Sequence, residues 1–435
     1  MFSLNPHWIL FCAVQCAQSH TVDPPNRHPN PVFYKRAQVW RTNLRNADDI
    51  LLIKRLMDNE DVSMWKLTPK QADFLVRCDM KLHVNRQLKA RDLNHTVLIM
   101  DVQRRIDAQT VEPDKWDKNS LRRGHRMNWN KYPTLEIINE YLNFLTKNYP
   151  SICKQEVIGR TFENNTITMM KVSNGNPSNK AIILNAGSHA REWIAITSAL
   201  VILREIVTKY DEQPSYMKDK DWYIIPLLNP DGFMYTQKTN RLWRKNRRRS
   251  KICYGVDINR NFNVSWYVKG ISQTSECKNT YIGPHPFSEK ESIALRDTVL
   301  KLKGRLNAVL DLHSYGQIVL HPWSGKSEPT DHKAIHNATA AGISRALYQH
   351  KKSKYKYGHT YHVIYPATGS ALDWVYANGV VHSYVIEGPD KGYHGFLMPP
   401  EQIERTGMEM LAAVKYLADV LKDRETGEEK RSSWF

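Results

Sequence analysis

Two residues of metal-ligand type stand three positions apart in the segment AIILNAGSHAREWIA, residues 181–195. His189 and Glu192 follow an apolar run that predicts a buried strand, and a long apolar helix is expected to begin near Trp193. Two such side chains in one short loop can reach the same metal ion. The spacing alone is weak evidence, because an exposed histidine beside a helix-capping glutamate explains it more simply.

Polar residues also follow three other apolar stretches. These are residues 306–312 before His313, residues 223–228 before Asn229-Pro-Asp-Gly, and residues 382–386 before Glu387. Polar groups beside buried strands need partners, and open α/β sheets bind ligands beyond the carboxyl ends of their strands. His189, Glu192 and His313 would make a His₂Glu set for one zinc ion, with the fourth position left to water, which is a catalytic arrangement.

With these motifs the chain resembles the pancreatic-type zinc carboxypeptidases, of the A and B kinds, over roughly residues 36–421. HAREW carries the first two zinc ligands of that family and LHSYGQ carries the third. The other roles that the resemblance implies are Glu387 in SYVIEGPD as the general base, Arg244 in NRLWRKNRR as the arginine that stabilises the oxyanion, Asn259 and Arg260 in GVDINRNF as the pair that holds the substrate's terminal carboxylate, and Tyr365 in VIYPATG as the mobile tyrosine that closes over the bound residue.

Physical chemistry agrees with these implied roles. Zinc polarises a scissile carbonyl and acidifies its water, and a neighbouring carboxylate can act as base. The planar guanidinium of Arg260 matches a carboxylate, so it can select a free C-terminus and make the enzyme an exopeptidase. A preorganised cation such as Arg244 counts most where negative charge develops. Asp257 could hold the outer ring nitrogen of His189.

The pocket for the departing side chain gives conflicting signals. Leu372 stands where this family has an apolar residue in A-type enzymes and an acidic one in B-type enzymes, which favours aromatic or aliphatic C-terminal residues. Asp311 aligns with a pocket position that is usually Ser or Thr, and a carboxylate there could bind water, a polar side chain or a basic one. Ser324 replaces a common glycine and would narrow the pocket.

Residues next to these motifs have more open interpretations. Arg241, in the same segment as Arg244, could assist peptide docking or be solvated. Ser314 and Tyr315 could line a neighbouring subsite. Pro366, after the closing tyrosine, departs from the commonest A-type pattern but removes no catalytic group.

The chain has six cysteines, and the two nearest the N-terminus would leave with a signal peptide. Cys78 lies in an alternating apolar run, residues 74–84, which predicts a buried thiol on the inward face of a strand. The resemblance implies a disulfide between Cys253 and Cys277, beside the Asn-Arg motif. Cys153 has no counterpart in the family and could be free or make an intermolecular bond.

Two units must position these residues. The order strand, helix, strand, strand, helix, strand predicts a small α+β open sandwich, with elements at 36–44, 47–57, 62–67, 74–84, 85–93 and 96–100. From residue 132 helices and apolar strands alternate up to a final amphipathic helix at 400–421, which indicates an α/β domain. The resemblance makes its central sheet mixed, with helices on both faces.

These patterns divide the chain into four segments. Residues 1–19 form an apolar run that ends in small residues and predicts a signal peptide, although a buried N-terminal segment is the alternative because the run lacks Lys and Arg. Residues 20–107 correspond to an activation domain that covers the active-site cleft in this family. The basic connector 108–128 would be the target of a trypsin-like protease, and residues 129–435 would form the catalytic domain.

Charge and composition limit the classes of molecule that the chain could bind. The 435 residues carry a net charge of +18, and the run RLWRKNRRRSK at 241–251 could be a polyanion-binding patch or a solvated loop. No stretch after the N-terminal run approaches the ~18 apolar residues that span a bilayer. We expect a secreted, extracellular monomer with one zinc ion, whose partners are peptide C-termini and an activating protease rather than nucleic acid or a membrane.

Two other functions compete with this hypothesis. A catalytically inert peptide-binding relative would be expected to lack the base, a zinc ligand or the oxyanion arginine, all of which this chain keeps. A polyanion-binding protein would depend on residues 247–251, and its salt-sensitive binding to heparin would survive the substitution Glu387→Gln.

Overall fold

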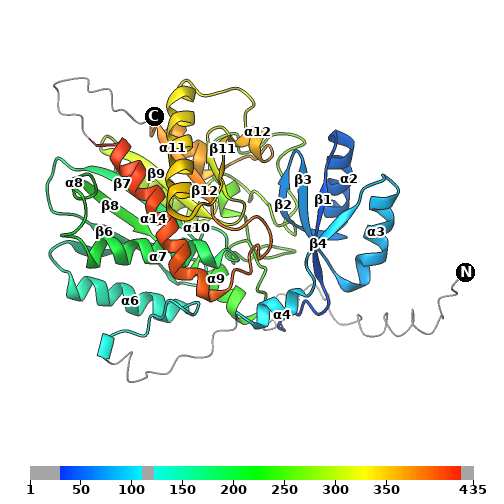
Figure 1. Ribbon diagram of the computed structural model, residues 1–435, viewed down its shortest axis with the longest axis horizontal. Coiled ribbons are helices and arrows are strands. Elements are labelled where there is room, and N and C mark those ends of the chain that lie inside the picture. Colours follow the sequence, from blue (N-terminus) through cyan, green and yellow to red (C-terminus); the bar gives the residue numbers. More distant parts are fainter. Residues whose placement is uncertain (1–29, 110–121, 423–435) are drawn as a thin grey trace, which may run out of the picture.

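The computed structural model describes residues 30–109 and 122–422, which form a smaller and a larger unit lying side by side (Figure 1). The smaller unit is built on a four-stranded antiparallel sheet with the order β2-β3-β1-β4. Its elements are β1 (Gln38–Asn43), α2 (Ala47–Asp58), β2 (Val62–Thr68), β3 (Gln71–Val76), η1 (Cys78–Met80), α3 (Lys81–Lys89), β4 (His95–Ile99) and α4 (Val102–Asp107). The predicted open sandwich is therefore present.

The two faces of the small sheet have different partners. Helices α2 and α3 cover the face turned away from the larger unit (Figure 1), and Leu52 and Leu88 bury their side chains there. The opposite face contributes Trp65 and Leu75 to an apolar cluster that also contains Phe396 of the larger unit. The sheet therefore joins the two units through its second face.

The predicted strand at residues 74–84 is wrong beyond Val76, where a short 3-10 helix and then α3 begin. The alternating apolar residues also contain the helical spacing Met80, Val84 and Leu88, and the last two are fully buried on one face of α3. Cys78 lies in the 3-10 helix and is half-buried, so its prediction as a buried residue on the inward face of a strand is also wrong.

The larger unit is built on an eight-stranded mixed sheet with the order β11-β10-β12-β9-β7-β8-β6-β5. Its strands are β5 (Cys153–Arg160), β6 (Thr166–Val172), β7 (Lys180–Ala186), β8 (Lys220–Ile225), β9 (Leu306–His313), β10 (Ile318–His321), β11 (Lys356–His359) and β12 (His382–Glu387). The four central strands β8, β7, β9 and β12 are parallel, so their carboxyl ends open on one edge. Both faces of these strands are covered, which explains why their sequences are mostly apolar.

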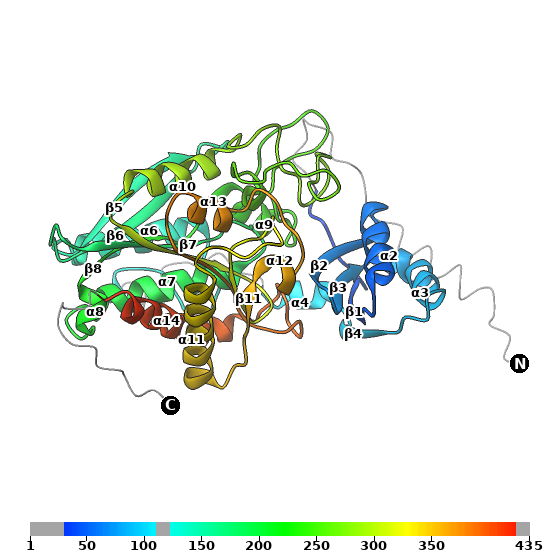
Figure 2. The same ribbon diagram turned by 90° about the horizontal axis from the view of Figure 1, so that it is seen from above.

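Helices pack on both faces of the large sheet, as predicted (Figure 2). One apolar core includes side chains from α6 (Leu135–Asn148), α7 (Trp193–Thr208), α8 (Ser215–Lys218), α9 (Pro230–Lys238), α11 (Lys333–Lys351) and α14 (Ile403–Val420). The core on the other face includes side chains from α10 (Lys290–Lys301), α13 (Ala371–Ala377) and η2 (Ile258–Arg260). The remaining short elements are α12 (Thr360–Val363) and η3 (Pro400–Gln402).

The cysteines of the larger unit include one buried thiol and one disulfide. Cys253 and Cys277 are bonded to each other, as the family resemblance implied. Cys153 is buried and free, and burial raises the pKa of its thiol to about 12. An intermolecular bond through this cysteine is therefore disfavoured in the folded chain.

The basic run at 241–251 is partly internal. Its buried members are Arg241, Lys245 and Arg247. Arg247 lies over three aromatic rings, with 3.6 to 4.9 Å between its guanidinium carbon and the ring centroids. Arg249 and Lys251 are exposed. Because much of the charge is used inside the fold, the run is a poor candidate for a polyanion-binding patch. Within 30–109 and 122–422, no helix is long and apolar enough to cross a membrane.

Candidate metal centre and its cleft

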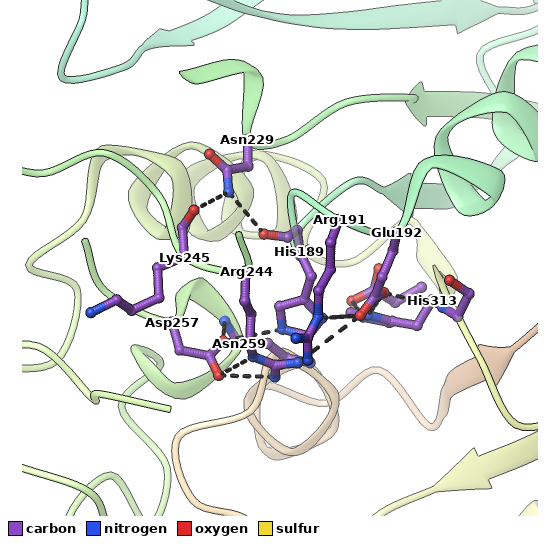
Figure 3. Close-up of polar contacts among 12 residues, drawn as sticks. His189, Arg191, Glu192, Asn229, Arg244, Lys245, Asp257, Asn259 and His313 are labelled. Carbon is purple, nitrogen blue, oxygen red and sulfur yellow. Dashed lines mark hydrogen bonds and ion pairs between the residues drawn. The ribbon is translucent and has the colours of Figure 1, made fainter. Parts of the chain in front are cut away.

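Three residues of metal-ligand type meet at the carboxyl ends of β7 and β9. His189 and Glu192 lie in the loop between β7 and α7, and His313 is the last residue of β9, which pairs in parallel with β7. The Nδ1 atom of His189 lies 2.9 Å from Oε1 of Glu192 and 3.1 Å from Nδ1 of His313. Nδ1 of His313 lies 3.0 Å from Oε2 of Glu192. All three side chains are buried and turned toward one point (Figure 3).

This donor set fits a zinc ion. Two ring nitrogens and a carboxylate, with all ligand atoms within 4.8 Å of one another, match the His₂Glu type of site. The outer nitrogen of each ring faces a buried carboxylate: Nε2 of His189 lies 3.1 Å from Asp257 Oδ1, and Nε2 of His313 lies 3.0 Å from Asp311 Oδ2. Such partners orient the other ring nitrogen toward a metal.

Electrostatics lower the pKa values of two carboxyl groups at the centre, those of Glu192 and Asp257. Burial acts to raise the pKa of Glu192, but the neighbouring His189 and His313 hold it well below its usual range. The pKa of Asp257 is likewise lowered despite burial, chiefly by Arg244 and then His189. Two ionised carboxylates beside the ligand atoms favour a divalent cation there.

Arg244 reaches the metal centre from the segment before η2. Its Nε and Nη2 atoms each lie 2.9 Å from Asp257 Oδ2, and its Nη1 lies 4.0 Å from Glu192 Oε1 (Figure 3). The same Asp257 carboxylate thus holds both His189 and Arg244. Asn229, which follows β8, donates to the carbonyls of Ser188 and Lys245 and so ties the loops of His189 and Arg244 together.

Glu387 ends β12 and pairs in register with His313 on β9, which brings its carboxyl group to the metal centre. Burial and the nearby Glu192 raise the pKa of Glu387 to about 7, against the opposing effects of His313, Arg244 and Lys66. A carboxyl group with such a pKa can accept and return a proton near neutral pH.

A cavity of about 850 Å³ lies between the two units, and Arg244 joins its lining to the metal centre. Arg260 lines it, donates from Nη1 to the carbonyl of Asn259 at 2.7 Å, and donates from Nη2 to the hydroxyl of Tyr365 at 3.0 Å. The side chain of Asn259 accepts from the backbone N–H of Ala371. Arg191 and Arg244 line the same cavity, which therefore suits an anionic ligand.

Arg191 is a cavity residue that the sequence reasoning missed, although it lies inside the AREW segment. It is buried, its guanidinium packs 4.1 Å from the ring centroid of Phe396, and its Nε and Nη1 have no hydrogen-bond partner among the described residues. Buried donors of this kind are available to a ligand.

Arg241 is not solvated. It is buried over the ring of Trp193 and donates to the side chain of Gln109 and to the carbonyls of Arg191 and Phe396. These contacts hold the loop of the metal ligands against the 396 segment. The solvated alternative is therefore wrong, and a contact of Arg241 with substrate stays a prediction.

Leu372, Ser324 and Asp311 were expected to shape the side-chain pocket. Leu372 is buried in an apolar cluster with residues of β10 and β12. Ser324 donates from its backbone N–H and its hydroxyl to Asp373. The Asp311 carboxylate lies against Asn185 and His313, and its contact with the side chain of a substrate stays a prediction.

The smaller unit covers the cleft. Trp65 and Lys66 of β2 line the cavity, and Tyr365 packs against the core of the smaller unit. Tyr315 is also covered, because its hydroxyl donates to Asp73 Oδ2 at 3.1 Å. Ser314, expected beside it in a subsite, is buried and donates its backbone N–H to Glu192. In this form the chain presents a closed site.

Comparisons with known proteins agree with this geometry. The family model described as zinc carboxypeptidase matches residues 138–413, and the model described as carboxypeptidase activation peptide matches residues 40–109. Carboxypeptidase A4 of Mus musculus is 35% identical over 397 residues, which cover 89% of this chain and 94% of that protein. Carboxypeptidase B of Rattus norvegicus is 32% identical over 410 residues, with coverages of 91% and 96%. The crystal structure of thrombin activatable fibrinolysis inhibitor gives a TM-score of 0.80 at 27% identity, covering 89% of this chain and 99% of that one.

Proposed function

The chain belongs to the zinc carboxypeptidase family and is a precursor with its activation peptide, and from this premise we propose that it is secreted and that its mature form removes single apolar or aromatic residues from peptide C-termini. The observation that carries the proposal is the convergence of the three zinc ligands, with Glu387 beside them and three arginines lining the neighbouring cavity.

The catalytic roles of Glu387 and Arg244 follow from their positions beside the zinc ligands. A zinc ion in a three-ligand site supplies a Lewis acid for the scissile carbonyl and acidifies water. Glu387 takes a proton from the attacking water and returns it to the leaving amine, which its raised pKa allows. Arg244, held by Asp257 beside the ligand Glu192, faces the point where negative charge develops on the carbonyl oxygen.

Arg260 explains why the C-terminal bond is attacked. Its guanidinium is buried at the cavity wall and is oriented by the carbonyl of Asn259 and the hydroxyl of Tyr365. A carboxylate can form two parallel charge-assisted hydrogen bonds with such a group, whereas an internal peptide bond offers no charge. Tyr365 would then exchange its contact with the smaller unit for one with the substrate.

The preference for apolar residues rests on Leu372. Its side chain lies in an apolar cluster with Ile318, Leu320 and Val385. Asp311 lies 3.0 Å from His313, which favours a role beside the metal ligand over the binding of a basic side chain. Similarity does not decide the question, because relatives named carboxypeptidase A and carboxypeptidase B are comparably identical to the chain.

The precursor form gives the smaller unit its function. We assign residues 1–19 to a signal peptide, 20–107 to the activation domain, 108–128 to the connector and 129–435 to the enzyme; most of the connector and all of residues 1–19 lie outside the described residues. Arg122 and Arg123 are exposed, while Arg126 is paired with Glu136 and Glu140, so we place the activating cleavage at the first two. The disulfide Cys253–Cys277 fits secretion.

A panel of blocked peptides that differ only in their C-terminal residue tests this function. After trypsin treatment the purified protein is expected to release Phe and Leu faster than Lys, Arg or Glu. The Leu372 cluster can pack against an apolar side chain but has no charged group to pair with a charged one. A zinc chelator is expected to abolish release. Faster release of Lys or Arg would overturn the apolar preference, and no release from a cleaved, zinc-loaded protein would contradict the enzymatic function itself.

The contact between Asp73 and Tyr315 predicts how tightly the uncleaved precursor is closed. Asp73 is buried, accepts from Tyr315 and pairs with Arg41, whose Nη2 also donates to the carbonyl of Lys391 in the larger unit. Asp73→Asn is expected to raise residual activity of the uncleaved precursor roughly ten-fold or more, since hydrogen bonds to charged groups contribute about 1.5–3 kcal/mol.

The measurement is release of C-terminal Phe before and after trypsin treatment. Asp79→Asn is the matched control, because Asp79 is exposed and pairs only locally with Arg77. Equal activity of the variant and the natural precursor before cleavage would show that this contact does not hold the smaller unit closed. Equal activity after cleavage is expected for all three proteins.

A further inference from the structure

Asp311 has a place in the site that neither its alignment nor the roles described so far explain. It lies on β9 two positions before His313, so both side chains project from the same face of the strand. Its Oδ2 atom lies 3.0 Å from Nε2 of His313, and its Oδ1 accepts a hydrogen bond of 2.8 Å from the side-chain amide of Asn185.

Each of these two atoms lies nearest the other. Asp311 Oδ2 and His313 Nε2 are both buried 3.0 Å apart, and neither makes a hydrogen bond with any described residue, so each is available to the other. Asn185 is the β-sheet neighbour of Asp311 on β7, and its amide fixes the plane of the carboxylate. The contact with His313 is therefore set by the backbone of two adjacent parallel strands and not by a flexible loop.

We propose that Asp311 is a positioning residue for the zinc ion. It accepts the Nε2 proton of His313, which selects the tautomer whose Nδ1 lone pair is directed at the ligand site and increases the basicity of that nitrogen. Asp257 makes the equivalent contact with His189. Both histidine ligands are thus backed by a carboxylate, and the centre binds zinc more tightly than one with a serine or threonine behind His313.

Zinc affinity of the full precursor tests the proposal without any need for activity. Asp311→Asn keeps the size of the side chain but removes its charge, and Asp311→Ser installs the residue type that the family resemblance leads one to expect. Both variants are expected to bind zinc 10- to 100-fold more weakly in a competition titration against a chromophoric chelator, because loss of such a partner typically costs that factor.

Thermal unfolding separates this role from general destabilisation. At saturating zinc, Tm of Asp311→Asn is expected to stay close to that of the natural protein. When zinc is added back to the zinc-free proteins, the variant is expected to need a higher zinc concentration to reach this Tm. An unchanged zinc dissociation constant would overturn the proposal, as would a loss of Tm that saturating zinc does not restore. A change in the preferred C-terminal residue with unchanged zinc affinity would also overturn it and return Asp311 to the side-chain pocket.

Discussion

Glu387→Gln is expected to lower kcat for peptide hydrolysis by about 10³-fold, within the range that a general base contributes. The substitution keeps the shape of the side chain but removes the group that takes a proton from water. Glu387 lies opposite His313 at the end of β12, and burial and Glu192 raise the pKa of its carboxyl group to about 7, which favours proton transfer near neutral pH.

The measurement is single-residue release from a blocked peptide by the trypsin-treated variant, together with its zinc content. Glu401→Gln serves as the control, because Glu401 is exposed and lies outside the cavity. The zinc content of both variants should equal that of the natural protein. A Glu387→Gln enzyme with intact zinc and activity within a few fold of normal would show that another group acts as the base.

Arg260→Lys is expected to raise KM for peptides with a free C-terminus by roughly 10- to 100-fold, since hydrogen bonds to charged groups contribute about 1.5–3 kcal/mol. Lysine keeps the positive charge but cannot form the two parallel hydrogen bonds of a guanidinium. It also cannot be oriented in the same way by the carbonyl of Asn259 and the hydroxyl of Tyr365.

Peptides with a free and an amidated C-terminus provide the specific readout. The natural enzyme should strongly prefer the free carboxylate, and Arg260→Lys should reduce that preference. Arg249→Lys is the matched control, because Arg249 is an exposed member of the nearby basic run. An unchanged preference for the free carboxylate would assign its recognition to another cation of the cavity, of which Arg191 is the first candidate.

The metal ligands could be predicted from the sequence because they follow long apolar strands. β7 and β9 are covered on both faces, so their sequences are mostly apolar, although Asn185 and Asp311 are polar residues within them. His189 follows the end of β7 and His313 ends β9, and the parallel arrangement brings both to one edge. The mixed sheet with helices on two faces followed from the same alternation of strands and helices, together with the family resemblance.

The contacts of side chains between distant segments could not be predicted. The environment of Asp311 depends on Asn185, which is 126 positions away, and that of Tyr315 depends on Asp73, which is 242 positions away. An alignment gives the position of a residue on its strand but not the neighbour that it contacts. Local periodicity was also ambiguous at residues 74–84, where alternating apolar residues fitted a strand and helix α3 equally well.

The strand order of the large sheet has a consequence for the sequence of events during folding. The four strands of the smaller sheet are complete once residue 99 has been synthesised, and their pairings are comparatively local. The central strand β9 instead pairs with β7, and the contact of Asn185 with Asp311 closes a loop of more than a hundred residues before β12 adds to its other edge. Non-local pairings of this kind form slowly. The sheet of the smaller unit can therefore form before the third zinc ligand has been synthesised, and we expect the metal site to be completed late in folding.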